Sequence, residues 1–148
     1  MIAYLDASAL VKRYIVERGS RETIALTADS EMTATSIVSL AEVAAAFAKG
    51  VRVGLVNDEV ARGTQRRFAG DWADLVRVPV TEALVERAEG LAWEHVLRGY
   101  DAIQLASAIT WQQSVGEEIV LATFDQQLWE AATRTGLKAW PDHLPGGE

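Results

Sequence analysis

Four acidic residues stand at or near the ends of apolar segments, and their side chains could do chemistry together. They are Asp6, Glu42, Asp101 and Asp125. Asp6 directly follows IAYL, and Asp125 follows IVLAT by one residue. Because reactive groups in open parallel sheets collect beyond the carboxyl ends of the strands, we expect all four carboxylates to point into one cleft.

Four carboxylates in one cleft would repel one another and raise one another's pKa, so such a cluster implies a bound cation. Ligands made only of oxygen suit the hard ions Mg²⁺ or Mn²⁺ rather than structural zinc. A single acid has a simpler explanation, because Asp101 at the start of a helix could cap the first free N–H groups. That alternative stays open for one acid and does not account for four.

The other reactive residues do not form a competing catalytic set. His95 and His143 are not spaced as a paired imidazole acid–base site. The sequence also has no Ser/His/Asp set and no glycine-rich phosphate loop. The carboxylates therefore remain the candidate catalytic groups.

Short apolar segments alternate along the chain with segments of helical periodicity. This pattern is typical of a parallel sheet covered by helices, and these strands and helices would position the acids. Strands are expected at residues 2–5, 32–35, 76–79, 119–123 and 137–140. Residues 1–141 are expected to form a single domain, with 142–148 as a short tail that frays.

The helices between these strands have expected limits and faces. The Ala-rich helix after the second strand should close at Gly50, and the helix before Asp101 should run to Gly99. The polar mid-chain helix should turn four apolar residues inward. They are Val60, Phe68, Trp72 and Leu75.

The composition limits the partners and the location. A net charge of −7 is the wrong sign for holding nucleic acid by bulk electrostatics, so any such contact must be local. The chain has no cysteine, no leader-like N-terminus and no apolar run of membrane-spanning length. We therefore expect no membrane association and a cytoplasmic location.

Four segments in order along the chain carry a resemblance to a known family: YLDASALVKRY, SLAEVAAA, YDAIQLASA and LATFDQQL. Together they resemble the PIN domain of VapC-type toxins, and the resemblance covers essentially the whole chain. It implies an α/β fold, a three-layer α/β/α sandwich with a central parallel sheet of about five strands. It also implies an endoribonuclease that depends on Mg²⁺ or Mn²⁺, a homodimer, and a small antitoxin that blocks the cleft.

The resemblance assigns roles to individual residues. The family's acidic, metal-binding positions match Asp6, Glu42, Asp101 and Asp125, and its small hydroxyl positions match Ser8 and Thr123. The hydroxyls are expected to orient carboxylates or metal-bound water. Two alternatives stay open, namely that Ser8 is a helix cap and that Thr123 is only a strand residue.

The resulting hypothesis is that Asp6, Glu42 and Asp101 hold one ion and that Asp125 serves a second ion or positions the attacking water. One ion or two stays open, and Asp125 binds metal either directly or through water. Lys12 or Arg13, a turn into the first helix, would contact the RNA backbone; an exposed helix face is the alternative.

Two other kinds of protein compete with the nuclease. A receiver-type signalling domain also sets acids around Mg²⁺, but LDAS lacks its paired acids and Lys138 stands at the wrong end of its strand. A catalytically silent PIN-like binding module would keep the shape and lose the chemistry. The presence of all four acids argues against it.

Overall fold

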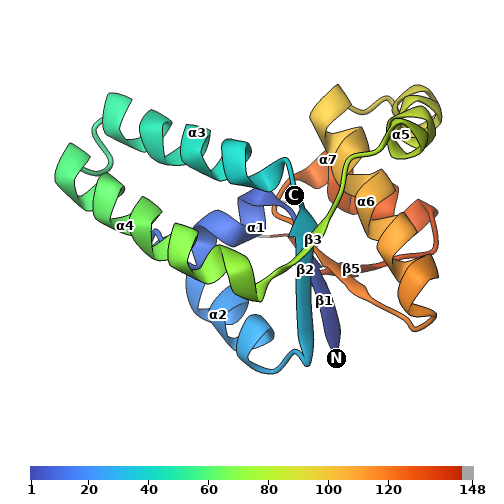
Figure 1. The fold of residues 1–148 in the computed structure, drawn as a ribbon, viewed down its shortest axis with the longest axis horizontal. Coiled ribbons are helices and arrows are strands. Elements are labelled where there is room, and N and C mark those ends of the chain that lie inside the picture. Colours follow the sequence, from blue (N-terminus) through green and yellow to red (C-terminus); the bar gives the residue numbers. More distant parts are fainter. Residues whose placement is uncertain (145–148) are drawn as a thin grey trace.

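A five-stranded, all-parallel sheet forms the centre of the computed structural model, which describes residues 1–144 (Figure 1). Its order is β3-β2-β1-β4-β5. The strands are β1 (Ile2–Leu5), β2 (Met32–Ser36), β3 (Val76–Val78), β4 (Val120–Ala122) and β5 (Lys138–Trp140). All five predicted strands exist, and their predicted limits differ from these by no more than a residue at either end.

Helices cover both faces of the sheet. One face carries α1 (Ala7–Lys12), α2 (Ser20–Ala28), α3 (Ser39–Arg52) and α4 (Asp58–Asp71), and the other carries α5 (Glu82–His95), α6 (Gly99–Val115) and α7 (Gln126–Arg134). A short 3₁₀ turn, η1 (Trp72–Asp74), leads into β3. The predicted three-layer α/β/α sandwich is confirmed.

The central strand shows why the sheet has two cores. All residues of β1 are buried; Ile2 and Tyr4 face the α5–α7 core, whereas Ala3 and Leu5 face the α1–α4 core. This alternation follows from the two-residue period of a strand. A strand buried on both faces reads as a continuous apolar run, which is what IAYL is.

The sheet order reverses between β1 and β4, and this reversal positions the site. The chain goes from β1 to β2 on one side, whereas β4 lies on the other side of β1. The backbone N–H of Asp6 donates to the carbonyl of Ala122 at 3.2 Å, which joins the carboxyl ends of the two strands. In α/β sheets a reversal of this kind opens a crevice in which ligands bind.

Two predicted helix limits are wrong. Helix α3 does not close at Gly50 but continues to Arg52, and the left-handed glycine that follows it is Gly54, at φ +79°. Helix α5 ends at His95, where Val96 takes a left-handed conformation. Gly99 is instead the first residue of α6. Spacing alone did not show that Gly54 and Val96, rather than Gly50 and Gly99, have the positive φ that follows these helices.

The predicted inner face of the mid-chain helix is partly wrong. Phe68 and Leu75 are buried and Trp72 is half-buried, but Val60 is 51% exposed.

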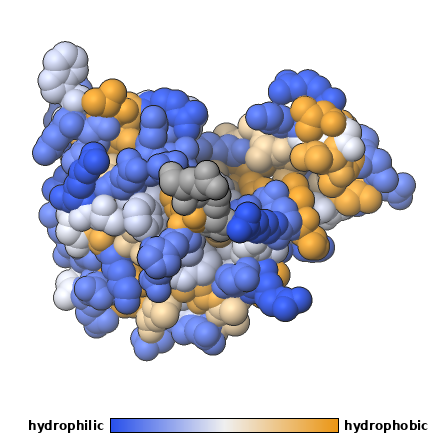
Figure 2. All heavy atoms as spheres, turned by 180° about the vertical axis from the view of Figure 1, so that it is seen from behind, coloured by the Kyte–Doolittle hydropathy of each residue, from blue (hydrophilic) through white to orange (hydrophobic). Residues whose placement is uncertain are grey.

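Within residues 1–144, no helix is long and apolar enough to cross a lipid bilayer. The face of the molecule seen from behind is largely hydrophilic, with hydrophobic side chains scattered across it (Figure 2). Of the predicted tail, 145–148 lie outside the described residues.

Candidate active site

Asp6 stands where β1 ends and α1 begins, and it is almost fully buried at 4% exposure. Its Oδ1 accepts from the backbone N–H of Ala9 at 2.9 Å, so Asp6 is the N-cap of α1. Ser8 Oγ donates to the same oxygen at 2.7 Å, and Thr123 Oγ1 donates to Oδ2 at 2.6 Å. We call Asp6, Ser8 and Thr123 the inner cluster.

The inner cluster holds a carboxylate without a cation hydrogen-bonded to it. The pKa of Asp6 is raised from 3.8 to about 6; burial is the largest cause, and the charge of the nearby Glu42 adds to it. The hydrogen bonds from Thr123, Ser8 and the Ala9 N–H lower it without cancelling the effect of burial. The site therefore favours a positive charge close to Asp6.

Thr123 and Ser8 also fix the loop that follows β4. The backbone N–H of Asp125 donates to Thr123 Oγ1 at 3.1 Å, and that of Phe124 donates to Ser8 Oγ at 2.9 Å. Asp125 in turn caps α7, because its Oδ1 accepts from the N–H of Leu128 at 2.9 Å. Each hydroxyl thus orients the Asp6 carboxylate and also holds the backbone beside Asp125.

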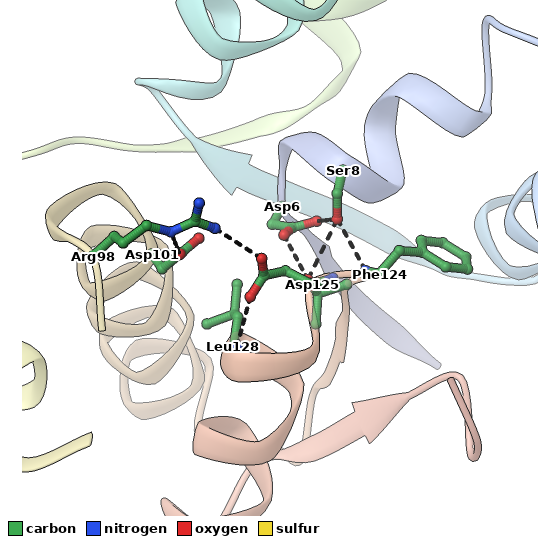
Figure 3. Close-up of polar contacts among 8 residues, drawn as sticks. Asp6, Ser8, Arg98, Asp101, Phe124, Asp125 and Leu128 are labelled. Atoms are coloured by element: carbon green, nitrogen blue, oxygen red, sulfur yellow. Dashed lines mark hydrogen bonds and ion pairs between the residues drawn. The ribbon is translucent and has the colours of Figure 1, made fainter. Parts of the chain in front are cut away.

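Asp101 meets Asp125 through an arginine. Arg98 Nε donates to Asp101 Oδ2 at 3.0 Å, and Arg98 Nη2 donates to Asp125 Oδ2 at 2.9 Å. Figure 3 shows the guanidinium lying between the two carboxylates, with Asp6 and Ser8 beyond them. We call Arg98, Asp101 and Asp125 the outer cluster.

The capping explanation for Asp101 is wrong. Asp101 is the third residue of α6, whose N-cap position is held by Arg98 without a side-chain cap bond. The side chain of Asp101 is buried and its hydrogen-bond partner is Arg98. Burial raises the pKa of Asp101, and the neighbouring Asp125 raises it further, whereas Arg98 lowers it. A buried acid that caps nothing needs another explanation.

Glu42 is held from a third direction by a buried amide. Gln104, 1% exposed, donates through Nε2 to Glu42 Oε1 at 2.9 Å and to Ser39 Oγ at 3.0 Å. The hydroxyl of Tyr4 donates to Gln104 Oε1 at 2.5 Å. Burial raises the pKa of Glu42, the hydrogen bond from Gln104 lowers it, and the charge of Asp101 raises it.

The four acids are coupled, but they do not form one ligand shell as their side chains stand. The charge of Glu42 raises the pKa of Asp6, the charge of Asp101 raises that of Glu42, and the charge of Asp125 raises that of Asp101. Within residues 1–144, no three acidic or imidazole side chains stand close enough together to hold a metal ion. The donor set is nevertheless made of carboxylate and hydroxyl oxygens, which fits Mg²⁺ or Mn²⁺.

The two basic residues expected near RNA lie in different places. Lys12 pairs with Glu17 Oε1 at 3.1 Å and lies over the ring of Phe124, beside the inner cluster. Arg13 lines a hollow of about 590 Å³ together with Met32 and Val76, the first residues of β2 and β3. That hollow therefore lies at the amino ends of the strands, whereas Asp6 follows the carboxyl end of β1. Lys12 is thus the only one of the two placed near Asp6.

Three residues that hold the acids in place, Arg98, Gln104 and Tyr4, were not predicted from the sequence. Arg98 stands three residues before Asp101 and Gln104 three residues after it, so both lie on its side of α6. This spacing was a usable signal for Arg98 and Gln104. Nothing in the sequence placed Tyr4 beside Gln104, because that contact joins residues 100 positions apart.

Comparison with known proteins places this arrangement in a family. The family model described as PIN domain matches residues 3–133. This chain belongs to the PIN domain family. Ribonuclease VapC45 of Mycobacterium tuberculosis (strain CDC 1551 / Oshkosh) is 33% identical over 144 residues, which cover 97% of each chain. The predicted resemblance to VapC proteins is therefore confirmed.

Solved structures share the fold of this PIN domain. VapBC2 from Rickettsia felis, solved with a promoter DNA fragment, superposes with a TM-score of 0.65 at 16% identity, covering 95% of this chain and 99% of the other. A toxin-antitoxin complex from Klebsiella pneumoniae gives a TM-score of 0.57 at 21% identity, covering 83% and 86%. These likenesses support the sandwich architecture.

Proposed function

We propose that this PIN domain is the toxin of a toxin–antitoxin pair and that it is an endoribonuclease, which hydrolyses RNA phosphodiester bonds with Mg²⁺ or Mn²⁺. Its relative of 33% identity is named a ribonuclease. The observation that carries the proposal is the meeting of Asp6, after β1, with the Thr123–Asp125 loop, after β4, where the sheet order reverses. This is the place where an α/β sheet binds its ligand.

In this proposal Asp6, Glu42 and Asp101 hold the ion, directly or through water, and Asp125 completes the site. When bound, the ion would supply charge neutralisation at the phosphate and a lowered pKa for an attacking water. Ser8 and Thr123 keep the Asp6 carboxylate oriented through the hydrogen bonds that they donate. Lys12, which lies over the ring of Phe124 and pairs with Glu17, would contact an RNA phosphate after this ion pair opens.

The partners follow from charge and from the family. A chain with net charge −7 suits an antitoxin segment rich in Arg or Lys, and such a side chain could neutralise the carboxylates in place of metal. A toxin-antitoxin complex is among the proteins that share this fold. We also propose a homodimer and a cytoplasmic site of action, where RNA is available.

The experiment that tests the function is RNA cleavage by the antitoxin-free protein in Mn²⁺, Mg²⁺ or EDTA. The parent should cut in either metal and not in EDTA, and Asp6→Asn and Asp101→Asn should each lose about a hundredfold or more of the rate. Asp58→Asn is the matched control, because Asp58 pairs only with the exposed Arg62 on α4. Cleavage that persists in EDTA would refute the metal-dependent mechanism.

Two alternatives predict different results in the same experiment. A silent binding module would bind neither Mn²⁺ nor Mg²⁺ and cut no RNA while remaining folded. A receiver-type domain would accept a phosphoryl group on an aspartate from a small phosphodonor, which the nuclease would not. Metal binding without cleavage across several RNA classes would instead indicate a narrow substrate.

A further inference from the structure

Arg98 makes an unusual contact, because one planar guanidinium joins acids from two different helices. Nε donates to Asp101 in the first turn of α6, and Nη2 donates to Asp125 at the N-cap of α7. The ring of Tyr100 lies 4.7 Å from the guanidinium carbon. Charge-assisted bonds from two nitrogens of a single arginine fix the geometry of both carboxylates.

The cation is the member of the outer cluster that can leave. The side chain of Arg98 is 55% exposed, whereas that of Asp101 is 6% exposed and that of Asp125 is 26% exposed. Both acids are anchored on packed helices, and Arg98 stands in the loop just before α6. Rotation of the arginine into solvent would leave the two carboxylates where they are.

Arg98 also occupies one oxygen of each carboxylate that an ion would use. Asp125 Oδ1 already accepts from the N–H of Leu128, so Oδ2 is the oxygen that α7 leaves free, and Arg98 Nη2 takes it. On Asp101, Oδ2 is likewise taken by Arg98 Nε. A guanidinium and a divalent ion at these oxygens would repel each other, so binding of one opposes binding of the other.

We propose that Arg98 is a built-in counter-ion, which occupies Asp101 and Asp125 in the metal-free protein and is displaced when Mg²⁺ or Mn²⁺ binds. Arg98 thereby weakens metal binding and keeps the outer carboxylates paired when no ion is present. This inference rests on the proposed function, because it requires the acids to be metal ligands.

The first test is calorimetric titration of Mn²⁺ into the parent, Arg98→Ala and Arg98→Lys. Arg98→Ala should bind Mn²⁺ about three- to tenfold more tightly than the parent, because the competing cation is gone. Arg98→Lys should fall between them, since an ammonium lacks the fork that spans two carboxylates. Arg87→Ala is the matched control: it removes one positive charge from α5, where Arg87 bonds Thr110 and Gln113, and should change the affinity less than twofold.

A second measurement detects the displacement itself. Melting temperatures of the parent, Arg98→Ala, Asp125→Asn and the double variant give the coupling between the two residues. The coupling should be present in EDTA and disappear in saturating Mn²⁺, because the ion replaces the ion pair. A surface ion pair that does not exchange with the metal would show the same coupling, or none, in EDTA and in Mn²⁺.

The two measurements separate failure of this inference from failure of the proposed function. If the parent binds Mn²⁺ and Arg98→Ala binds it equally or more weakly, Arg98 does not compete with the ion and only this inference is refuted. If the folded parent binds no Mn²⁺ at all, the metal-dependent function is refuted together with it. Tighter binding by Arg98→Ala with loss of the coupling in Mn²⁺ supports both.

Discussion

The inner and outer clusters stabilise acids in opposite ways. In the inner cluster, neutral hydroxyls and a backbone N–H surround the buried Asp6. In the outer cluster, one half-exposed arginine pairs with both Asp101 and Asp125. Neutral donors orient a carboxylate but leave its charge, whereas an arginine neutralises part of that charge.

This difference indicates what each cluster contributes to metal binding. Among residues 1–144 no cation pairs with the carboxylate of the inner cluster, so this carboxylate gains most from an incoming ion. The outer cluster is already paired and must exchange one cation for another. Changes to the inner cluster should therefore alter the metal-free protein strongly, and changes to the outer cluster should alter it weakly.

The largest expected effect is the pH dependence that Asp6 gives to the metal-free protein. Its pKa is about 6 in the folded protein against an ordinary 3.8, so over this interval the folded protein keeps a proton that the unfolded chain has lost. Stability should therefore fall as the pH rises from about 4 to about 6, by about 3 kcal/mol at most. Asp6→Asn should remove the largest share of this fall.

Urea unfolding in EDTA across this pH range measures the effect directly. Asn is also a good helix N-cap, so Asp6→Asn keeps the start of α1 and should be more stable than the parent at neutral pH. Asp58→Asn, on the exposed face of α4, should follow the parent at every pH. Identical pH profiles for the parent and Asp6→Asn would contradict the buried, uncompensated charge.

The next largest effect is expected from Thr123, which joins the inner cluster to the loop after β4. Thr123→Val keeps the shape but leaves Asp6 Oδ2 and the N–H of Asp125 without their hydroxyl partner, at a cost of about 2 to 3 kcal/mol. Thr123→Ser restores the hydroxyl and should recover most of the loss. Unfolding free energies in EDTA at low pH and at neutral pH provide the measurement.

Arg98→Ala is the corresponding change in the outer cluster. Removing Arg98 should change the unfolding free energy of the metal-free protein far less than Thr123→Val does, because exposed ion pairs contribute little. A larger loss of unfolding free energy for Arg98→Ala than for Thr123→Val would contradict the view that the outer cluster contributes less than the inner one to the metal-free protein.

The sequence was enough to predict the sheet and to place Asp6 after its first strand and Asp125 after its fourth. An apolar run followed by an acid, as in IAYL before Asp6, marks the carboxyl end of a buried strand, and the structure has all five strands near their predicted positions. The hydroxyl of Ser8, expected from the family resemblance to orient a carboxylate, donates to Asp6 two residues before it in the chain.

Contacts between distant segments were not predictable in the same way. Arg98 reaches Asp125 across 27 positions, and Gln104 reaches Glu42 across 62. These contacts depend on how α6 lies against α7 and against the start of α3, which helical periodicity does not specify. The capping alternative for Asp101 could not be excluded from the sequence for a related reason: an acid in the first turn resembles a cap, and only the backbone shows that the helix begins at Gly99.

A smaller effect is expected from Gln104, which holds Glu42 between the clusters. Gln104→Leu removes the bonds to Glu42 and Ser39 and leaves the Tyr4 hydroxyl without its acceptor, costing about 1 to 2 kcal/mol. The pKa of Glu42 should rise in this variant, because the hydrogen bond from Gln104 lowers it in the parent. Titration of Mn²⁺ at several pH values should then show that the variant needs a higher pH than the parent to bind the ion.

Gln113 on the same helix offers the control for this change. Its side chain accepts from Arg87 at the exposed surface, away from the acids, so Gln113→Leu should leave both the stability and the pH dependence of Mn²⁺ binding unchanged. If Gln104→Leu behaves like Gln113→Leu, Glu42 is not held by Gln104 in solution.

The smallest effect is expected from Asp101→Asn in the metal-free protein. The substitution removes a buried charge repelled by Asp125, which stabilises, and it also breaks the ion pair with Arg98, which destabilises. Since the two contributions oppose each other, the melting temperature in EDTA should change by less than it does for Asp6→Asn. With Mn²⁺ the order changes: the parent should gain more stability than Asp101→Asn, because the variant has lost a ligand. An equal gain from Mn²⁺ in both proteins would remove Asp101 from the metal site while leaving Asp6 in it.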